Sequence, residues 1–280
     1  MNKKIKKQVK WEGPCGSISP TNNRDLLNLF DNDILLKYFS DKQSSDDLKK
    51  VKVITEKSLK YLRKIFKSYD LTSAYHNFDH NYTTTVTSFR AFIGALKINE
   101  SITVNDLKLL LLASLFHDTG YLLNSSFKSK SNVVTHIVRS LIFMESFVKK
   151  LDWDNRDVND LLILGQFTDY SKWKKDRLKI INHDCKINTV LAKIIVGADF
   201  MQVVDRNYFD NLDILNEFLK ITQGIEEKKG QKKFYNLSSD VTQWIWEYLD
   251  AFYEGKDKDP YRKGWKHFKS GMTKRFGIDI

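Results

Sequence analysis

Proline is nearly absent from this 280-residue chain, which has only Pro14, Pro20 and Pro260. Because proline removes a backbone donor and breaks helix interiors, its absence from the long middle of the chain favours an all-α protein. Cysteine is equally scarce: Cys15 and Cys185 are too few to predict a disulfide framework.

Long apolar runs are missing as well. No segment approaches the roughly 18–20 consecutive apolar residues that a membrane-spanning helix needs. The basic residues 1–7 are not followed by the apolar stretch of a secretory signal. We therefore expect a cytoplasmic protein that has no membrane segment.

Acidic residues are outnumbered by lysine and arginine, 35 to 46, which gives a net charge of +11. This excess suits an anionic ligand or a nucleic acid, and part of it lies near the ends of the chain, in residues 1–10 and 266–275. No specific nucleic-acid motif accompanies it. We interpret the charge as a solubilising surface that tolerates phosphate groups.

Apolar residues recur at helical spacing through most of the chain. The predicted helices cover residues 59–66, 86–96, 107–116, 134–148, 161–164, 190–198, 212–219 and 241–252. The run 107–116 is apolar on nearly every side, so it should cross the centre of a domain. We also predict a short helix at 26–39, a polar loop at 41–47, a charged connection at 226–233, and a cap at 238–240 for the last helix.

Histidines and aspartates stand at the edges of these apolar segments. His76 and His80, four positions apart, would share one face of a helix. His117 and Asp118 follow the central run, and Asp199 follows the run 190–198. Imidazoles and carboxylates that meet at one point can hold a divalent metal, and buried carboxylates are costly unless they are paired or metal-bound. Taken singly, each residue has a simpler explanation, such as a helix cap for Asp199, but together they predict a metal centre.

The same residues resemble the H…HD…D signature of the HD superfamily of metal-dependent phosphohydrolases. Residues 75–80 (YHNFDH), 168–172 (TDYSK) and 197–200 (GADF) are similar to the YHNxxH, TDMSK and ADLS motifs of class I cyclic nucleotide phosphodiesterases. Residues 116–121 (FHDTGY) resemble the HDTGF of bacterial HD proteins. The resemblance covers roughly residues 59–220.

This resemblance implies an HD-domain, phosphodiesterase-like helical bundle at residues 51–225. A partly irregular extension would precede it at 1–50, and a helical extension packing on it would follow at 226–280. One or two divalent ions are implied, with Zn, Mg, Mn and Fe all compatible. The residues implied as ligands of the first metal are His80, His117, Asp118 and Asp199. Asp118 would also bridge to a second metal, His76 would be the general acid, and Thr168 would hold a water on the second metal.

The chain also departs from the phosphodiesterase pattern. Tyr121 stands where those enzymes have a second histidine. Their acidic residue upstream of the next helix's histidine has no counterpart here, because Asn132 and Val133 occupy that region. That histidine is His136, which would line the pocket or contribute to the second metal. Two weaker candidates for substrate contacts are Lys172, for a phosphate, and Gln243, for a purine base. Both are also compatible with a solvated helix face.

The resemblance predicts hydrolysis of a small-molecule phosphoester, with a cyclic nucleotide as the first expectation. Three alternatives stay open: a phosphohydrolase acting on another nucleotide, a degenerate HD domain that senses a nucleotide, and a di-iron oxygenase. The oligomeric state stays open too, with a homodimer among the expectations.

Overall fold

The computed structural model describes residues 10–14, 16–68, 70–71, 76–123, 133–151, 153–168, 189–212, 216 and 225–278. Helices make up nearly all of the described elements, which confirms the predicted all-α bundle. The sheet in this part of the chain is an antiparallel pair of two-residue strands, β1 (Asp70–Leu71) and β2 (Leu122–Leu123).

Three helices pack against one another at the centre: α4 (Phe78–Lys97), α5 (Val104–Phe116) and α9 (Thr189–Phe200). Helix α5 begins at a capping box in which Thr103 and Asp106 satisfy each other's backbone donors. Most of its residues are buried, as expected for the run that is apolar on every side. The prediction of a central helix at 107–116 is confirmed.

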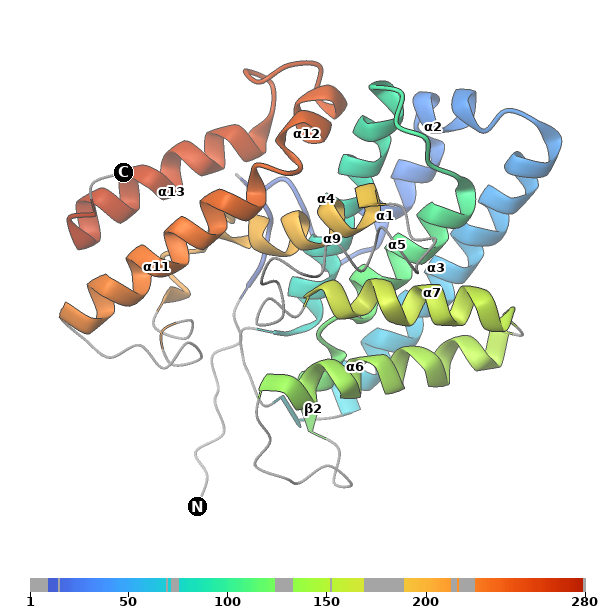
Figure 1. The fold of residues 1–280 in the computed structure, drawn as a ribbon, viewed down its shortest axis with the longest axis horizontal. Helices are drawn as coiled ribbons and strands as arrows, with labels where there is room; N and C mark the ends of the chain where they lie inside the picture. Colours follow the sequence, from blue (N-terminus) through green and yellow to red (C-terminus); the bar gives the residue numbers. More distant parts are fainter. Residues whose placement is uncertain are drawn as a thin grey trace.

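The remaining helices surround this centre (Figure 1). Helix α3 (Lys42–Ser68) packs on α5, α6 (Val133–Val148) packs on α7 (Asn155–Gly165), and α12 (Trp246–Phe252) packs on α4. Helices α11 (Ile225–Thr242) and α13 (Pro260–Phe276) contact each other on a side of the bundle away from α6 and α7. The short elements are α1 (Arg24–Leu27), η1 (Asn28–Asp31), α2 (Asp33–Tyr38), η2 (Thr119–Tyr121), η4 (Lys149–Leu151), η5 (Gln166–Thr168) and η7 (Met201–Val204).

One contact explains why α12 lies so close to α4. Gly94 faces the backbone of Tyr248, and a Cβ atom at position 94 would overlap the carbonyl oxygen of Tyr248. Glycine is therefore required here by space, because its missing side chain lets the two helix backbones touch.

Several local predictions are wrong. Residues 42–47 belong to α3, because the Asp41 carboxylate accepts a hydrogen bond from Ser44 N (2.9 Å) and starts the helix there. Residues 226–233 lie within α11. Ser238 also lies inside that helix and donates to Phe234 O, so residues 238–240 cap nothing. The predicted helix at 26–39 is divided into α1, η1 and α2, while the prediction at 212–219 falls mostly outside the described residues.

The described ends of the chain join the same core as the middle. A single cluster of buried apolar residues includes Trp11, Leu115 and Ile278. Among the helices described, none is both long enough and apolar enough to cross a membrane.

Candidate metal centre

The ends of the three central helices bring the predicted ligands together. His80 lies in the first turn of α4, whose N-cap residue Asn77 accepts a hydrogen bond from His80 N (3.0 Å). His117 and Asp118 follow the last residue of α5, and Asp199 lies in the last turn of α9.

One nitrogen or oxygen atom from each of these four residues lies within 4.8 Å of the others. His80 Nε2 is 3.0 Å from Asp118 Oδ2 and 3.2 Å from Asp199 Oδ1. His117 Nε2 is 3.2 Å and 3.4 Å from the same two oxygens, and 3.2 Å from His80 Nε2. This group of His80, His117, Asp118 and Asp199 could hold a metal ion, and we call it the four-ligand cluster.

The separations fit a shared ion. Atoms about 2.1 Å from one metal lie about 3.0 Å apart at a right angle and about 3.4 Å apart at the tetrahedral angle. The five separations above span 3.0 to 3.4 Å. Two imidazoles and two carboxylates are a mixed nitrogen and oxygen donor set, which suits Zn, Mn or Fe better than the all-oxygen sites that Mg and Ca prefer.

The ring of His117 is oriented by the helix that precedes it. Its Nδ1 lies 2.7 Å from Ser114 O. Because a carbonyl oxygen can only accept, Nδ1 carries a proton. When the ring is neutral, as metal binding requires, the lone pair of Nε2 therefore faces the cluster. This is the tautomer that a metal ligand requires.

The electrostatics of the cluster are dominated by burial and by its own charges. Burial alone raises the pKa of Asp199, but the imidazoles of His117 and His80 outweigh that effect and lower this pKa to about 2. Burial lowers the pKa of His117, and the carboxylates of Asp118 and Asp199 more than reverse it. The carboxylates are therefore ionised at neutral pH. About a fifth of the Asp199 side chain remains exposed (21%), which leaves the cluster open on that side.

Three further aromatic side chains lie beside Asp118. Tyr121 stacks between His76 (ring centroids 4.1 Å apart) and His136 (4.2 Å). His76 Nε2 is 3.6 Å from Asp118 Oδ2, and His136 Nε2 is 4.0 Å from Asp118 Oδ1. The two histidines therefore approach different oxygens of one carboxylate, and Tyr121 fills the space between them.

The prediction that His76 and His80 share one helix face is wrong, although their two rings do lie close together. His76 precedes α4, which begins at Phe78, so the two histidines do not share a helix face. The turn at Asn77 places their ring centroids 5.3 Å apart instead. Burial lowers the pKa of His76 to about 3, against the opposing effect of Asp118, so this imidazole is neutral at pH 7.

The other predicted site residues are not joined to the cluster by any described contact. Thr168 ends η5 and donates to Gly165 O (3.0 Å). Gln243 is exposed and donates to Asp240 O (2.8 Å). Lys172 and Tyr75 lie outside the described residues.

Sequence reasoning missed Trp11. Its ring is fully buried, with its centroid 5.8 Å from that of His80. Asp205 fastens the segment around it, because Asp205 Oδ2 accepts hydrogen bonds from Glu12 N (2.8 Å) and Gly13 N (2.6 Å). A lone tryptophan in an otherwise polar segment was the only available signal.

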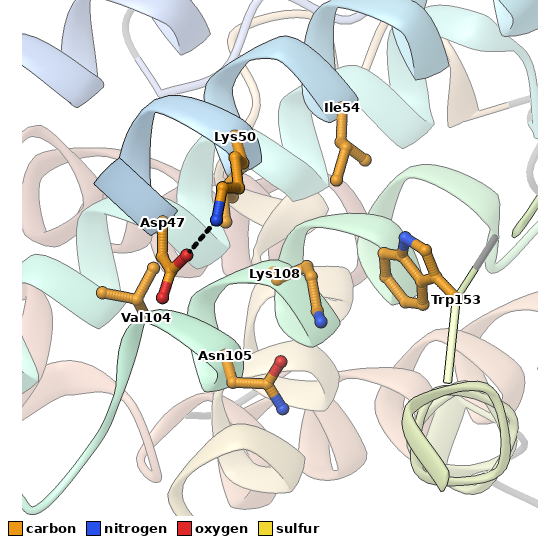
Figure 2. A pocket seen from close by; sticks show the side chains of 8 residues that line it. Asp47, Lys50, Ile54, Val104, Asn105, Lys108 and Trp153 are labelled. Atoms are coloured by element: carbon orange, nitrogen blue, oxygen red, sulfur yellow. Dashed lines mark hydrogen bonds and ion pairs between the residues drawn. The ribbon is translucent and has the colours of Figure 1, made fainter. Parts of the chain in front are cut away.

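A cavity of about 240 Å³ lies at the opposite end of α5, between α3 and Trp153 (Figure 2). Its two lysines are already engaged: Lys50 pairs with Asp47 (2.7 Å), and Lys108 pairs with Asp157 (2.6 Å) while lying over the Trp153 ring. No residue of the four-ligand cluster lines this cavity. It is separate from the candidate metal centre.

Comparison of the chain with models of known protein families gave no match, and comparison with curated proteins gave none either.

Proposed function

We propose that this protein is a metal-dependent phosphohydrolase that cleaves a phosphoester, with a cyclic nucleotide as the first substrate class to test. The observation that carries the proposal is the convergence of His80, His117, Asp118 and Asp199 from three separate helix ends, with donor separations of 3.0–3.4 Å. The resemblance of the surrounding motifs to HD phosphohydrolases adds the substrate class.

In this proposal the four-ligand cluster holds one divalent metal. A metal in such a site lowers the pKa of a bound water and offsets negative charge on a phosphoester. His117 is held in its ligand tautomer by Ser114 O, and His80 is held by the Asn77 cap. Asp118 presents its second oxygen toward His136, so these two residues would contribute to any second metal.

His76 is the residue placed to move a proton. It is not one of the four ligands, its Nε2 lies 3.6 Å from Asp118 Oδ2, and its ring is fixed by stacking on Tyr121. Because burial favours the neutral form of His76, this ring would first take up a proton and then give it to the departing alkoxide. A positioned imidazole in this role typically contributes about 10²- to 10⁴-fold to the rate.

A second candidate is a nucleotide sensor that binds without cleavage. The stack of His76, Tyr121 and His136 favours it, because a tyrosine ring fills space where a second-metal ligand would stand. In the described part of the chain, the side chains left near a second metal are then Asp118, His76 and His136, a sparse set.

Elemental analysis of protein purified without chelator is the first test. The parent should carry about one equivalent of a transition metal, and His80→Ala, His117→Ala and Asp118→Ala should lose both metal and turnover. His76→Gln should keep the metal and lose about 10²-fold or more in rate. His267→Ala, which changes an exposed histidine on α13, is the matched control and should alter neither.

A substrate screen then separates the alternatives. A cyclic phosphodiesterase converts a cyclic nucleotide into a monoester without releasing inorganic phosphate, whereas a nucleotide phosphatase releases it. A sensor gives neither product, but its ligand raises the melting temperature. Iron-dependent oxygen uptake would identify an oxygenase. A metal-free parent protein, or a His76→Gln variant as active as the parent, would contradict the proposal.

A further inference from the structure

Two neighbouring helices carry runs of positive charge. Residues 260–276, which form α13, contain six lysines and arginines and no acidic residue. Helix α11 contains four lysines at 228–233, with Glu226, Glu227 and Asp240 nearer its ends. The two helices contact each other, and Lys228 near the start of α11 lies beside Gly277 at the end of α13. We call the solvent-facing side of this pair the basic face.

Three lysines of the basic face point into solvent, whereas Arg262 is paired with Asp250 (2.7 Å). On α13, Lys263, Lys266 and Lys274 are exposed. At 100° per residue they fall within about 80° of arc, and at 1.5 Å per residue they span about 17 Å. Within the described residues, none of these three lysines has a carboxylate within ion-pair distance.

The opposite side of α13 packs against the hydrophobic core. Tyr261, Phe268 and Met272 are buried there, and no large apolar residue of α11 or α13 is exposed among those described. A helix that binds a membrane surface inserts apolar side chains below the headgroups. The basic face has none to insert, so its chemistry fits a polymer with regularly repeated charges better than a bilayer.

We propose that the basic face of α11 and α13 binds the phosphate backbone of a nucleic acid. Recognition would be through phosphates rather than bases, because lysines act as point charges and the exposed face offers few planar side chains to read a base edge. The four-ligand cluster takes no part in this binding, so the inference is independent of the proposed function.

Counterion release gives the expected size of the effect. Four lysine–phosphate contacts on a duplex give a slope of about −3.6 for log K against log salt. Raising the salt from about 50 to about 200 mM should then weaken binding about 150-fold. A single strand with the same contacts should show a slope of about −2.8.

The test is fluorescence anisotropy with a labelled DNA duplex and with a labelled single-stranded RNA, on the full chain. The triple variant Lys263→Glu, Lys266→Glu and Lys274→Glu should weaken binding at least about 50-fold and make the salt slope shallower by about three. The matched control is Lys57→Glu, Lys60→Glu and Lys64→Glu, which changes net charge equally at three exposed positions of α3. It should weaken binding less than about fivefold.

Several results would overturn the inference. These are equal losses in the two triple variants, no binding by the parent at about 50 mM salt, or a preference for vesicles of anionic lipid over nucleic acid. Thermal melts of both triple variants check folding, and the milder Lys→Gln triple at positions 263, 266 and 274 replaces the Glu triple if the latter unfolds. Binding should persist in His80→Ala, which separates this inference from failure of the metal centre.

Discussion

Replacing Asp205 by alanine tests how the segment around Trp11 is held beside the candidate metal centre. The buried Asp205 carboxylate accepts three backbone hydrogen bonds, from Glu12 N (2.8 Å), Gly13 N (2.6 Å) and Asn207 N (2.7 Å). The Gly13 bond is fully buried and the other two are partly buried. In the alanine variant all three donors lose this acceptor.

The magnitude follows from the cost of unmet donors. A buried N–H without an acceptor costs about 1–3 kcal/mol, and a partly buried one costs less because water reaches it. We expect Asp205→Ala to lower the free energy of unfolding by about 2–5 kcal/mol. Asp205→Asn should lower the free energy of unfolding by less than Asp205→Ala, because its amide oxygen still accepts. It should still destabilise the fold, because its NH₂ group cannot accept from a backbone N–H. Releasing the segment also removes Trp11 from the ring of His80, so metal affinity should fall.

Urea unfolding of metal-free protein measures the first effect, and competition with a chelator measures the second. Asp210→Ala is the control: this aspartate is exposed, five residues away, and the change should stay within about 0.5 kcal/mol of the parent. An Asp205→Ala variant within about 1 kcal/mol of the parent would refute the role of this carboxylate. Unchanged metal affinity in a clearly destabilised variant would refute the link to His80.

Two other substitutions probe the frame around the site. Gly94→Ala should lower the free energy of unfolding by about 3 kcal/mol or more, because the new Cβ overlaps the backbone of Tyr248. Thermal unfolding measures this loss, and a loss under about 1 kcal/mol would show that α12 can move aside. Burial raises the pKa of Asp259 to about 7. The folded state therefore binds more protons than the unfolded state between about pH 4 and pH 7. As the pH rises through that window, the free energy of unfolding should fall by a few kcal/mol. Asp259→Asn keeps an acceptor for Tyr261 N and should remove most of this pH dependence of the free energy of unfolding. Urea unfolding at several pH values measures it. Parallel pH profiles for parent and variant would contradict the raised pKa of Asp259.

Helix α4 shows why burial was only partly predictable. Its sequence suggests one apolar stripe with polar residues facing solvent, yet Thr83, Thr85 and Thr87 are buried. Each of these hydroxyls donates to a carbonyl oxygen four residues earlier, so the polar group is satisfied within its own helix. Because threonine can bury itself in this way, composition alone does not distinguish a helix buried on all sides from a half-exposed one.

The candidate metal centre was visible in the sequence because its residues adjoin apolar runs. His117 and Asp118 directly follow the most apolar segment, and polar residues at such a point need an explanation. Trp11 and its tether were not visible, since Gly13 and Asp205 are 192 positions apart and no pattern relates them. Contacts of that kind depend on tertiary packing, which a local pattern does not encode.

The position of the carboxylates on their helices strengthens the metal interpretation. Asp199 lies in the last turn of α9 and Asp118 follows α5, so both lie at helix C-termini. A helix cap of the kind considered for Asp199 would lie at an N-terminus, so that simpler explanation is wrong. The negative end of the helix dipole disfavours an anion by about 0.3–1 kcal/mol at each place. Two carboxylates and two negative helix ends thus meet at one largely buried point, and a cation shared between them is the partner that this arrangement favours.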